Sequence, residues 1–448
     1  MINAIQLYNT LSGTKELFKP LGKQVLLYVC GITPYDYAHM GHGRCYVTFD
    51  MLYRLLKFGG YSVTYCRNFT DIDDKLIDRA LAHYGDENKY IVIAQKYIDA
   101  YHEDMKALGC LPPTYEPRVT QTIPEIIAFI QGLIDKNKAY VVDGDVYFSI
   151  DSFKEYGALS KRNVDDLVAG VRVEVNDKKR NPLDFALWKS EPEGHFWQSP
   201  WGYGRPGWHI ECSAMANKFL GETIDIHAGG MDLIFPHHEN EIAQSQALHE
   251  KPFVRYWMHN GFVRINQEKM SKSLGNFFTL RDVFKEFDPM VVRFYFLNHH
   301  YRAPLDFSFD DLKAMHKTYQ RLCKFFEVMP GENNFAYEDV KDFDVLKRML
   351  AFVCDDLNTP GMFGVLFESW AELQQDRVQH RAVKAFLQQV LGLLLLPLPE
   401  KEVIITEQMQ HLIDERHAAR AAKDWAKADE LRDELKELGY DVQDKKVK

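Results

Sequence analysis

The stretch from Tyr28 to Arg44, YVCGITPYDYAHMGHGR, determines how the first part of the chain folds. Residues 25–29, which lead into it, are apolar and rich in β-branched and aromatic side chains, a pattern that predicts a buried strand. After it, apolar residues recur at helical spacing until the glycine pair at 59–60, which predicts a helix that ends there. The chain is therefore expected to pass from a strand through a loop into a helix that begins at HMGH, residues 39–42.

The loop between this strand and this helix is a predicted ligand site. In an open α/β sheet, ligands bind beyond the carboxyl ends of the strands. Backbone N–H groups and the dipole at a helix N-terminus favour phosphate there, and the imidazoles of His39 and His42 can add donors. A strand–helix turn with two surface histidines is the alternative, and the HxGH pattern alone leaves both interpretations open.

Alternating strand and helix patterns continue along the chain. Residues 62–68 predict a second strand, residues 70–74 predict the cap of the next helix, and residues 89–108 predict a long helix. This β-α-β-α order is typical of a parallel, doubly wound sheet. Three prolines in residues 111–117 break the pattern, which resumes after GYGRPG at 202–207, so an insertion is predicted between these two points.

The later part of the chain predicts two further strands and then helices. Residues 223–227 and 254–258 predict strands, and Pro236 stands where a proline favours the first position of a helix. From about residue 310 the pattern is helical almost to the end, and residues 418–438 predict a last amphipathic helix.

The composition indicates a globular protein of several domains. Its 448 residues exceed the roughly 250–300 at which a single core divides, and the hydrophobic share of 46% is ordinary. No apolar run reaches the ~18 residues that a membrane span needs, and the first residues do not resemble a secretion signal, so we expect a cytoplasmic protein.

The cysteine count and the net charge exclude little by themselves. Seven cysteines without a CxxC spacing argue against a disulfide framework and leave reduced or metal-bound thiols open. The net charge of −10 argues against a nucleic-acid partner only weakly, because a local basic stripe is what contacts phosphate.

Residues 269–273, KMSKS, form a second candidate site for nucleotide phosphates. Lys269 and Lys272, with two hydroxyl groups on a glycine-ended loop, can neutralise the charge of a leaving pyrophosphate. Alone, such a loop is as well explained by a solvated surface. Together with the upstream HxGH pattern, it indicates the chemistry of class I aminoacyl-tRNA synthetases, in which a carboxylate attacks the α-phosphate of ATP.

Four separated residues carry the donor atoms that zinc prefers. Cys30 ends the first predicted strand, Cys212 lies in WHIEC, and His237 and Glu241 lie in FPHHENE. If Pro236 starts a helix, His237 and Glu241 are four residues apart and share one face. Two sulfurs, a nitrogen and an oxygen are a plausible zinc set. Nothing local brings the four together, so buried structural cysteines and an ordinary helix histidine stay open.

The chain resembles the cysteinyl-tRNA synthetases, a class I family, over nearly its whole length. The resemblance rests on seven blocks, several of them specific to the cysteine enzymes: YVCGITPYDYAHMGH (28–42), RNFTDIDDK (67–75), KKRNPLDFALWK (178–189), GRPGWHIECSAM (204–215), DIHAGGMDLIFPHHENEIAQS (225–245), YWMHNG (256–261) and EKMSKSLGNF (268–277).

The resemblance implies that one zinc ion is bound by Cys30, Cys212, His237 and Glu241. A zinc-bound thiol is deprotonated, so an open position on the metal would select cysteine by its thiolate, while serine offers only a weak hydroxyl ligand. Discrimination by one methylene is worth only ~1–3 kcal/mol. No large editing insertion is visible in residues 112–205, which fits selection at the metal.

The resemblance also implies roles for further residues. The catalytic residues would be His39, His42, Lys269 and Lys272. The ATP-binding residues would be His39, Gly41, His42, Gly229, Gly230, Asp232 and Lys272. The residues around the bound cysteine would be Thr70, Trp208 and His227. For the last two sets, a core tryptophan and an ordinary diglycine turn are the alternatives.

The chain departs from the family pattern in three places. Met40 stands where the signature has isoleucine, which is close to a volume-conserving change, and Ala228 stands where the family commonly has glycine. Relatives often end in a Thr-Trp-basic segment, which residues 444–448 lack. Anticodon contacts are therefore expected from other basic residues at helical spacings of four, three and four, with a merely solvated face as the alternative: Arg416, Arg420, Lys423 and Lys427.

We expect a Rossmann-type doubly wound parallel sheet split by a connective insertion and followed by an all-α C-terminal helical bundle. The expected segments are 1–111 and 206–262 for the two halves of the catalytic domain, 112–205 for the insertion, 263–309 for the KMSKS loop and stem-contact segment, 310–400 for the bundle and 401–448 for a helical anticodon-binding region.

The expected activity is the ATP-dependent formation of cysteinyl-adenylate, with Mg²⁺ accompanying the ATP, and transfer of cysteine to tRNA-Cys by a monomer without a membrane partner. A ligase that transfers cysteine to an amino-sugar, as in mycothiol synthesis, would not need the helices after residue 310. A non-catalytic, zinc-stabilised RNA-binding protein would need neither HMGH nor KMSKS. A simple HxGH nucleotidylyltransferase would be shorter and lack the zinc set.

Overall fold

The computed structural model describes residue 2 and residues 5–162, 178–265, 268–269, 277–327, 335–398 and 406–437. Lys272 of the KMSKS sequence and residues 444–448 lie outside these ranges, and so does the side chain of Lys269. The chain forms two compact units, Met1–Leu396 and Pro397–Lys448.

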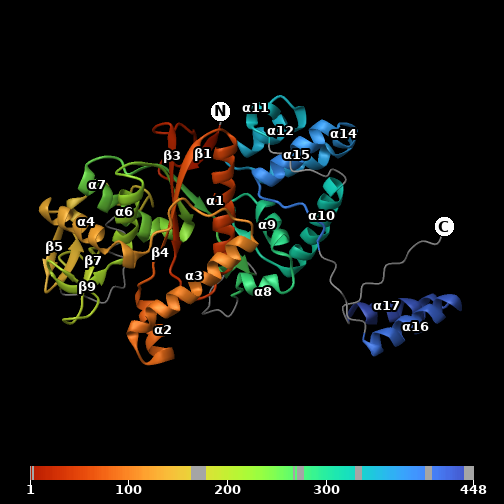
Figure 1. Cartoon of the computed structure of the whole chain (residues 1–448), viewed down its shortest axis with the longest axis horizontal. Coiled ribbons are helices and arrows are strands. Elements are labelled where there is room, and N and C mark those ends of the chain that lie inside the picture. Colours follow the sequence, from red (N-terminus) through yellow and green to blue (C-terminus); the bar gives the residue numbers. More distant parts are fainter. Residues whose placement is uncertain are drawn as a thin grey trace. The chain divides into compact units, whose positions relative to one another are not determined.

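A four-stranded sheet lies at the centre of the first unit (Figure 1). Its strands are all parallel and follow the order β11 (Val254–Asn260), β10 (Ile224–Gly230), β3 (Gln24–Ile32) and β4 (Ser62–Phe69). Parallel neighbours need crossover connections, which the intervening helices supply. The predicted doubly wound α/β fold and its four predicted strands are confirmed.

Helix α1 (Met40–Phe58) returns the chain from β3 to β4 and is buried almost all round, between the sheet and α9 (Pro289–Leu297). It ends at Gly59, whose N–H donates to the Leu55 carbonyl at 2.8 Å. The helix predicted after HMGH, with its end at the glycine pair, is confirmed. The two helices that follow β4 are α2 (Asp74–Tyr84), capped by Asp73, and α3 (Tyr90–Ala107).

The segment between α3 and the second half of the sheet forms a small layer of its own. Helix α4 (Ile123–Asp135) precedes an antiparallel sheet with the order β5 (Ala139–Val142), β6 (Asp145–Phe148), β7 (Phe185–Ser190), β9 (Gly202–Pro206) and β8 (Trp197–Ser199). The hairpin predicted around residues 143–145 is present, with positive φ at Asp143 and Gly144. Helix α6 (Trp208–Phe219) then leads back to β10.

Figure 1 shows this small sheet, with α4, α6 and α7 (Glu239–His249), on one side of β3 and β4, and the later helices on the other side. Before β3 lies the hairpin β1 (Gln6–Asn9) and β2 (Thr14–Leu17). After β11 come three short strands, β12 (Val263–Ile265), β13 (Glu268–Lys269) and β14 (Leu305–Asp306), with α8 (Leu280–Phe284) and α9 between the last two.

A helical bundle completes the first unit. Its helices are α10 (Phe309–Glu327), α11 (Tyr337–Val340), α12 (Asp344–Val353), α13 (Thr359–Glu368), α14 (Trp370–Gln375) and α15 (Arg377–Gln389). The helical pattern predicted from about residue 310 is therefore confirmed. Among the described helices, none combines the length and the apolar surface that crossing a membrane requires.

The second unit contains α16 (Glu407–Ala421) and α17 (Trp425–Glu437), joined through an apolar cluster of Met409, Leu412, Leu431 and Leu435. The prediction of one helix over 418–438 is wrong, because residues 422–424 form a turn in which Lys423 has a φ of 62°. The basic residues expected along one helix face therefore lie on two helices and a turn. Arg416 in particular is buried, with only 4% of its surface exposed.

Candidate active site and metal centre

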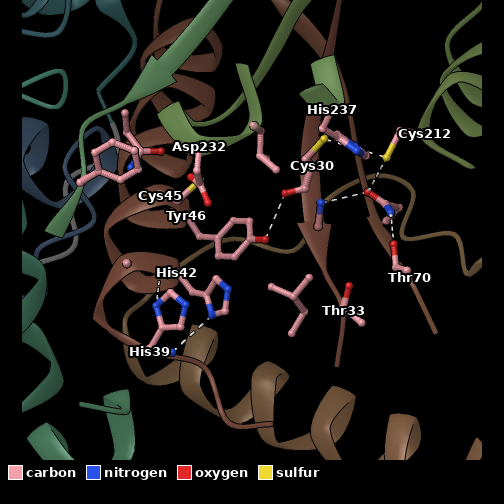
Figure 2. A pocket seen from close by; sticks show the side chains of 18 of the residues that line it. Cys30, Thr33, His39, His42, Cys45, Tyr46, Thr70, Cys212, Asp232 and His237 are labelled. Atoms are coloured by element: carbon pink, nitrogen blue, oxygen red, sulfur yellow. Dashed lines mark hydrogen bonds between the residues drawn. The ribbon is translucent and has the colours of Figure 1, made fainter. Parts of the chain in front are cut away.

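A cavity of about 360 Å³ opens at the carboxyl ends of β3, β4 and β10, where ligands bind in parallel α/β sheets. Figure 2 shows Cys30, His237 and Cys212 gathered at one end of it, with His39 and His42 at the other. The predicted site residues among its lining are Cys30, His39, Gly41, His42, Thr70, Trp208, Cys212, Gly230, Asp232 and His237.

His39 and His42 cap the helix that follows β3. The N–H of His42 donates to Nδ1 of His39, and the N–H of His39 donates to Nδ1 of His42, each at 3.3 Å. The two rings stack with their centroids 3.6 Å apart. Because Nδ1 accepts in both rings, a neutral ring carries its proton on Nε2 and can donate it to a phosphate.

Gly41 makes this stacked arrangement possible. A Cβ at this position would lie 2.9 Å from Cε1 of His39, closer than the ring could tolerate without moving. The small residue in the HxGH pattern therefore serves the histidine geometry as well as access to the backbone of the first helical turn.

The four predicted metal ligands converge from three separate segments of the chain: Cys30 from β3, Cys212 from α6, and His237 and Glu241 from α7 and the turn that leads into it. Their donor atoms lie within 4.8 Å of one another, and all four residues are buried. The two sulfurs of Cys30 and Cys212 are 3.9 Å apart, Cys30 Sγ is 3.7 Å from Glu241 Oε1, and His237 Nε2 is 3.1 Å from the same oxygen. Two sulfurs bound to one tetrahedral zinc at 2.3 Å would be about 3.8 Å apart. The residues fit a zinc ion.

The protonation states of the cluster also suit a metal. The hydrogen bond from the Cys30 thiol lowers the pKa of Cys212, while burial raises the pKa of Cys30. Burial alone would raise the pKa of Glu241, but His227 and His237 lower it to about 2. The site thus favours a thiolate and a carboxylate, the forms that bind a metal, and zinc would displace the remaining thiol proton.

A second layer of side chains orients these ligands. His227 Nε2 holds the other carboxylate oxygen of Glu241 at 2.9 Å, and Nδ1 of His209 lies 3.0 Å from Nδ1 of His237. Such partners fix the ring orientation and the protonation state of metal ligands. On the Cys30 side, the hydroxyl of Tyr46 donates to the Cys30 carbonyl at 3.1 Å.

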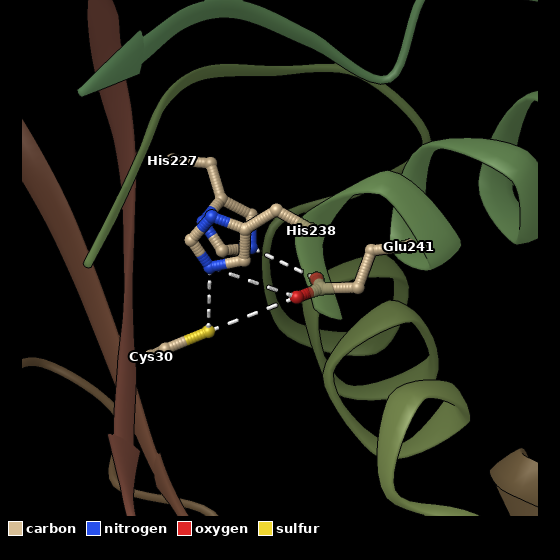
Figure 3. Close-up of side chains that lie close together, drawn as sticks. All are labelled: Cys30, His227, His238 and Glu241. Carbon is tan, nitrogen blue, oxygen red and sulfur yellow. Dashed lines mark hydrogen bonds and ion pairs between the residues drawn. The ribbon is translucent and has the colours of Figure 1, made fainter. Parts of the chain in front are cut away.

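A second set of donors shares two members with the first (Figure 3). His238 Nε2 lies 3.2 Å from Cys30 Sγ, and His227 and His238 together with Cys30 and Glu241 could also surround an ion. His227 and His238 are completely buried and do not belong to the described lining of the cavity. In the set that contains Cys212 and His237, by contrast, three of the four residues line the cavity, so an ion held there would face it.

Of the three residues predicted around the bound cysteine, Thr70 and Trp208 line the cavity, whereas His227 is not part of its described lining. Trp208 packs on the His237 ring with centroids 4.2 Å apart, and Thr70 donates its hydroxyl to the buried Glu211 at 2.9 Å. Both line the cavity. His227, predicted beside the cysteine, lies one layer behind the cavity, because the sheet register turns it onto Glu241 and Trp257.

The diglycine that ends β10 lets the side chains of Leu233 and Asp232 pack close to the backbone of this strand. A Cβ on Gly230 would lie 2.5 Å from Asp232 Oδ1, and one on Gly229 would lie 2.9 Å from the side chain of Leu233. Gly230 and Asp232 line the cavity, whereas Gly229 is not part of its described lining.

No role was predicted from the sequence for Asn68, His209 or His238. Asn68 Oδ1 accepts from the N–H of Gly31 at 2.9 Å and lies 3.8 Å from Cys212 Sγ, so it joins the ends of β3 and β4 beside the metal ligands. The two histidines are sequence neighbours of Trp208 and His237, which was the available signal. Their partners are remote in sequence, and only the fold brings them together.

This parallel sheet, with a histidine-capped helix N-terminus at its carboxyl edge, is the catalytic architecture of the class I aminoacyl-tRNA synthetases. The family model for the class I (C) catalytic domain of tRNA synthetases matches residues 17–317. A solved methionyl-tRNA synthetase of Mycobacterium tuberculosis, bound by methionyl-adenylate, superposes with a TM-score of 0.56 at 14% identity, over 82% of this chain and 88% of its own. At that identity the likeness concerns the fold.

Sequence relatives are much more similar. A cysteine–tRNA ligase of Trichlorobacter lovleyi is 48% identical over 98% of this chain and 97% of its own length, and one of a Geobacillus species is 48% identical over 99% and 98%. The model for the cysteinyl-tRNA ligase anticodon binding domain matches residues 405–448. The chain belongs to the cysteine–tRNA ligase family.

Proposed function

We propose that this chain activates L-cysteine with ATP to form cysteinyl-adenylate and transfers the cysteine to tRNA-Cys. The observation that carries the proposal is one cavity with two thiols, an imidazole and a carboxylate at one end and a histidine-capped helix N-terminus at the other. The first end suits a thiol-bearing amino acid, and the second suits the phosphates of ATP.

Cysteine binds at the end of the cavity that holds Cys30, Cys212, His237 and Glu241. Zinc held by these four residues supplies a soft, positively charged position that favours a thiolate over a hydroxyl group. Trp208 and Thr70 close the pocket around the rest of the amino acid. Because Glu241 and His237 are each held by a second side chain, the pocket keeps its shape before the substrate arrives.

Activation joins the carboxylate oxygen of cysteine to the α-phosphorus of ATP and breaks the bond from that phosphorus to the bridging oxygen, so pyrophosphate leaves with the electron pair. His39 and His42 donate Nε2–H groups to the phosphates and stabilise the charge that develops there. Gly41, Gly230, Asp232 and the adjacent Gly229 shape the nucleotide side of the cavity. Lys269 and Lys272 neutralise the leaving pyrophosphate, which Mg²⁺ accompanies.

Transfer then joins a hydroxyl oxygen of the terminal adenosine of tRNA-Cys to the carbonyl carbon of the adenylate, and AMP leaves. The match of residues 405–448 to an anticodon binding domain supports tRNA as the acceptor over an amino-sugar. Of the four basic residues predicted to contact the tRNA, Arg416 is buried and Lys423 lies in the turn between α16 and α17.

The bundle offers a further surface for the tRNA. Two neighbouring hollows of about 400 and 520 Å³ share Arg321 and Trp370, and no acidic residue is among their described lining. Within the described ranges, five exposed cations on this side of the bundle form no ion pair or hydrogen bond with another described residue. These cations, which we call the basic surface, are Lys317, Arg321, Lys324, Arg377 and Arg381.

The chemistry of the basic surface suits a nucleic-acid backbone. Lys317, Arg321 and Lys324 recur at helical spacing on α10, and Arg377 and Arg381 do so on α15. The nearby carboxylate of Glu372 is paired with Arg348. On a protein of net charge −10, unpaired cations beside the aromatic rings of Phe325 and Trp370 favour phosphate and bases as partners.

The enzyme is further proposed to act as a cytoplasmic monomer, which is what the family resemblance implies. Light scattering of the purified protein checks the monomer.

The function is tested by ATP–pyrophosphate exchange and by aminoacylation with the purified protein. Exchange that depends on cysteine, followed by charging of tRNA-Cys, is the expected result. Exchange without charging of any tRNA, combined with transfer of cysteine to an amino-sugar, would favour the rival ligase. An absence of cysteine-dependent exchange would contradict the proposal.

A further inference from the structure

The segment that follows the KMSKS sequence packs on the turn that holds the two cavity histidines. The N–H of Leu280 donates to the Ala38 carbonyl at 2.8 Å, and residues His39 and Thr279 form a β-bridge. The ring of Phe277 meets the His39 ring edge-on, with the centroids 5.3 Å apart. Residues 277–280 therefore pack against the first turn of α1 and the residues just before it.

Arg281 connects residues 277–280 to α3. Its Nε donates to Asp104 Oδ1 at 3.0 Å, and its Nη2 donates to Glu103 Oε2 at 2.6 Å and to the Ala100 carbonyl at 3.1 Å. The guanidinium also lies over the ring of Tyr37, 5.0 Å from its centroid. One side chain thus joins α8, α3 and the loop that leads from β3 to the histidines.

Asp104 occupies an unfavourable place for a carboxylate. It is 3% exposed, and its Oδ2 has no hydrogen-bond partner among the described residues. Burial raises the pKa of its carboxyl to about 6, although Arg281 acts in the opposite direction. Burying a carboxylate with one unsatisfied oxygen costs stability. Among the described residues, Arg281 is the side chain that donates a hydrogen bond to Asp104. This contact explains why a carboxyl group occupies the buried position of Asp104.

We propose that Arg281 is a positioning residue for amino-acid activation: by holding residues 277–280 against the first turn of α1, it fixes the rings of His39 and His42 at the cavity. Neither Arg281 nor Asp104 belongs to the described lining of the cavity, so they act through the histidines and not on the substrates. The inference rests on the proposed role of this turn in binding ATP. A displacement of ~1 Å in a reacting assembly costs on the order of 100-fold in rate.

The test compares Arg281→Gln, Arg281→Lys, Asp104→Asn and the control Lys285→Gln, which removes an exposed cation from the same stretch of chain. Pyrophosphate exchange gives kcat and the KM values, and the amplitude of the adenylate burst counts active sites. Arg281→Gln is expected to lower kcat per active site by about 10- to 100-fold with the KM for cysteine unchanged. Arg281→Lys should recover part of the loss, and the double variant with Asp104→Asn should lose no more than Arg281→Gln alone.

Amide hydrogen exchange supplies a readout that does not depend on activity. Arg281→Gln and Asp104→Asn should speed exchange in residues 38–43, and Lys285→Gln should not. Equal kcat per active site in Arg281→Gln and the wild type, or unchanged protection of residues 38–43, would overturn the inference. If the wild type itself shows no cysteine-dependent exchange, the proposed function fails, and the protection of residues 38–43 still decides whether Arg281 positions the turn. Should Arg281→Gln not fold, the same comparisons apply to Arg281→Lys and Asp104→Asn.

Discussion

The ionisable side chains of the predicted metal ligands at the cavity are buried and paired with one another, whereas those of the basic surface on the bundle are exposed to solvent and have no ionic partner among the described residues. Glu241 is completely buried and contacts His227 and His237 through its two oxygens. Arg321 and Arg377, in contrast, are exposed and have no described ionic partner. The side chains of the cavity are therefore fixed in place before a ligand binds. The cations of the basic surface are available to pair with the negative charges of a ligand.

The difference predicts how each region responds to mutation. In a buried network, the loss of one partner leaves another group uncompensated in a medium of low dielectric constant, so single substitutions have large effects. An exposed cation contributes one screened contact, and its loss changes affinity by a small, salt-dependent amount.

Replacing Cys212 by serine should abolish metal binding and cysteine activation together. Serine is a weak zinc ligand, and its hydroxyl would leave His237 and Glu241 as a buried charged pair without the thiolate. We expect exchange activity to fall by more than the roughly 100-fold that outer partners of a metal contribute. Metal analysis alongside pyrophosphate exchange checks this, with Cys323→Ser in the bundle as the matched control. Full activity in Cys212→Ser would contradict the assignment.

Replacing His209 by asparagine should weaken the site without removing a ligand. The variant loses the imidazole nitrogen that faces His237 Nδ1 at 3.0 Å. Loss of such an orienting partner costs about 10- to 100-fold in metal affinity. Competition with a chromogenic chelator measures this affinity. A loss as large as that of Cys212→Ser would mean that His209 is itself a ligand.

The stability of the enzyme should depend on pH through Asp104. Its folded-state pKa of about 6 lies above the ordinary value, so the folded protein binds this proton more tightly than the unfolded chain does. The favourable contribution is present below about pH 4 and is lost as pH rises through about 6. Over that range the unfolding free energy of the wild type should fall relative to Asp104→Asn by about 3 kcal/mol, since each pKa unit is worth about 1.4 kcal/mol.

Urea unfolding at a series of pH values checks this dependence. Asp99→Asn, an exposed change on the same helix, is the control and should give a curve parallel to that of the wild type. A parallel curve for Asp104→Asn as well would show that the carboxyl titrates normally in the folded protein.

The basic surface should give the smallest effects. Replacing Arg321 and Arg377 together by glutamine should weaken tRNA binding and lower the slope of its salt dependence by about two, one for each phosphate contact. Pyrophosphate exchange without tRNA should be unchanged. The matched control replaces Lys313 and Lys341, which pair with Asp310 and Glu338 on the same bundle. If the salt dependence of tRNA affinity has the same slope in both double variants, the basic surface does not bind the tRNA.

The sequence predicted those parts of the molecule that depend on local pattern. The strand before HMGH, the helix after it and the hairpin near Asp143 follow from periodicity and turn residues, and the structure has all three. The four metal donors were proposed by their chemistry and by resemblance. Their convergence depends on the order of β3 and β10 in the sheet, which no local pattern encodes.

The wrong prediction of a single last helix and the position of His227 also have physical causes. Residues 418–438 have a helical composition throughout, but the chain turns at Lys423, and the apolar contacts between α16 and α17 stabilise two helices over one. His227 was predicted beside the bound cysteine from the family resemblance, and it lies behind the described lining of the cavity. The direction of its side chain follows from strand register, which a single sequence does not specify.

The selection of cysteine is proposed to depend on zinc bound by the buried cluster of two thiols, an imidazole and a carboxylate. Metal analysis of the wild-type enzyme, combined with pyrophosphate exchange on cysteine and on serine before and after chelation, tests it directly. We expect about one zinc per chain, loss of cysteine activation on chelation with recovery on adding zinc, and a preference for cysteine over serine on the order of 10⁴-fold or more. Cysteine activation that survives removal of the metal, or comparable activation of serine, would contradict the account.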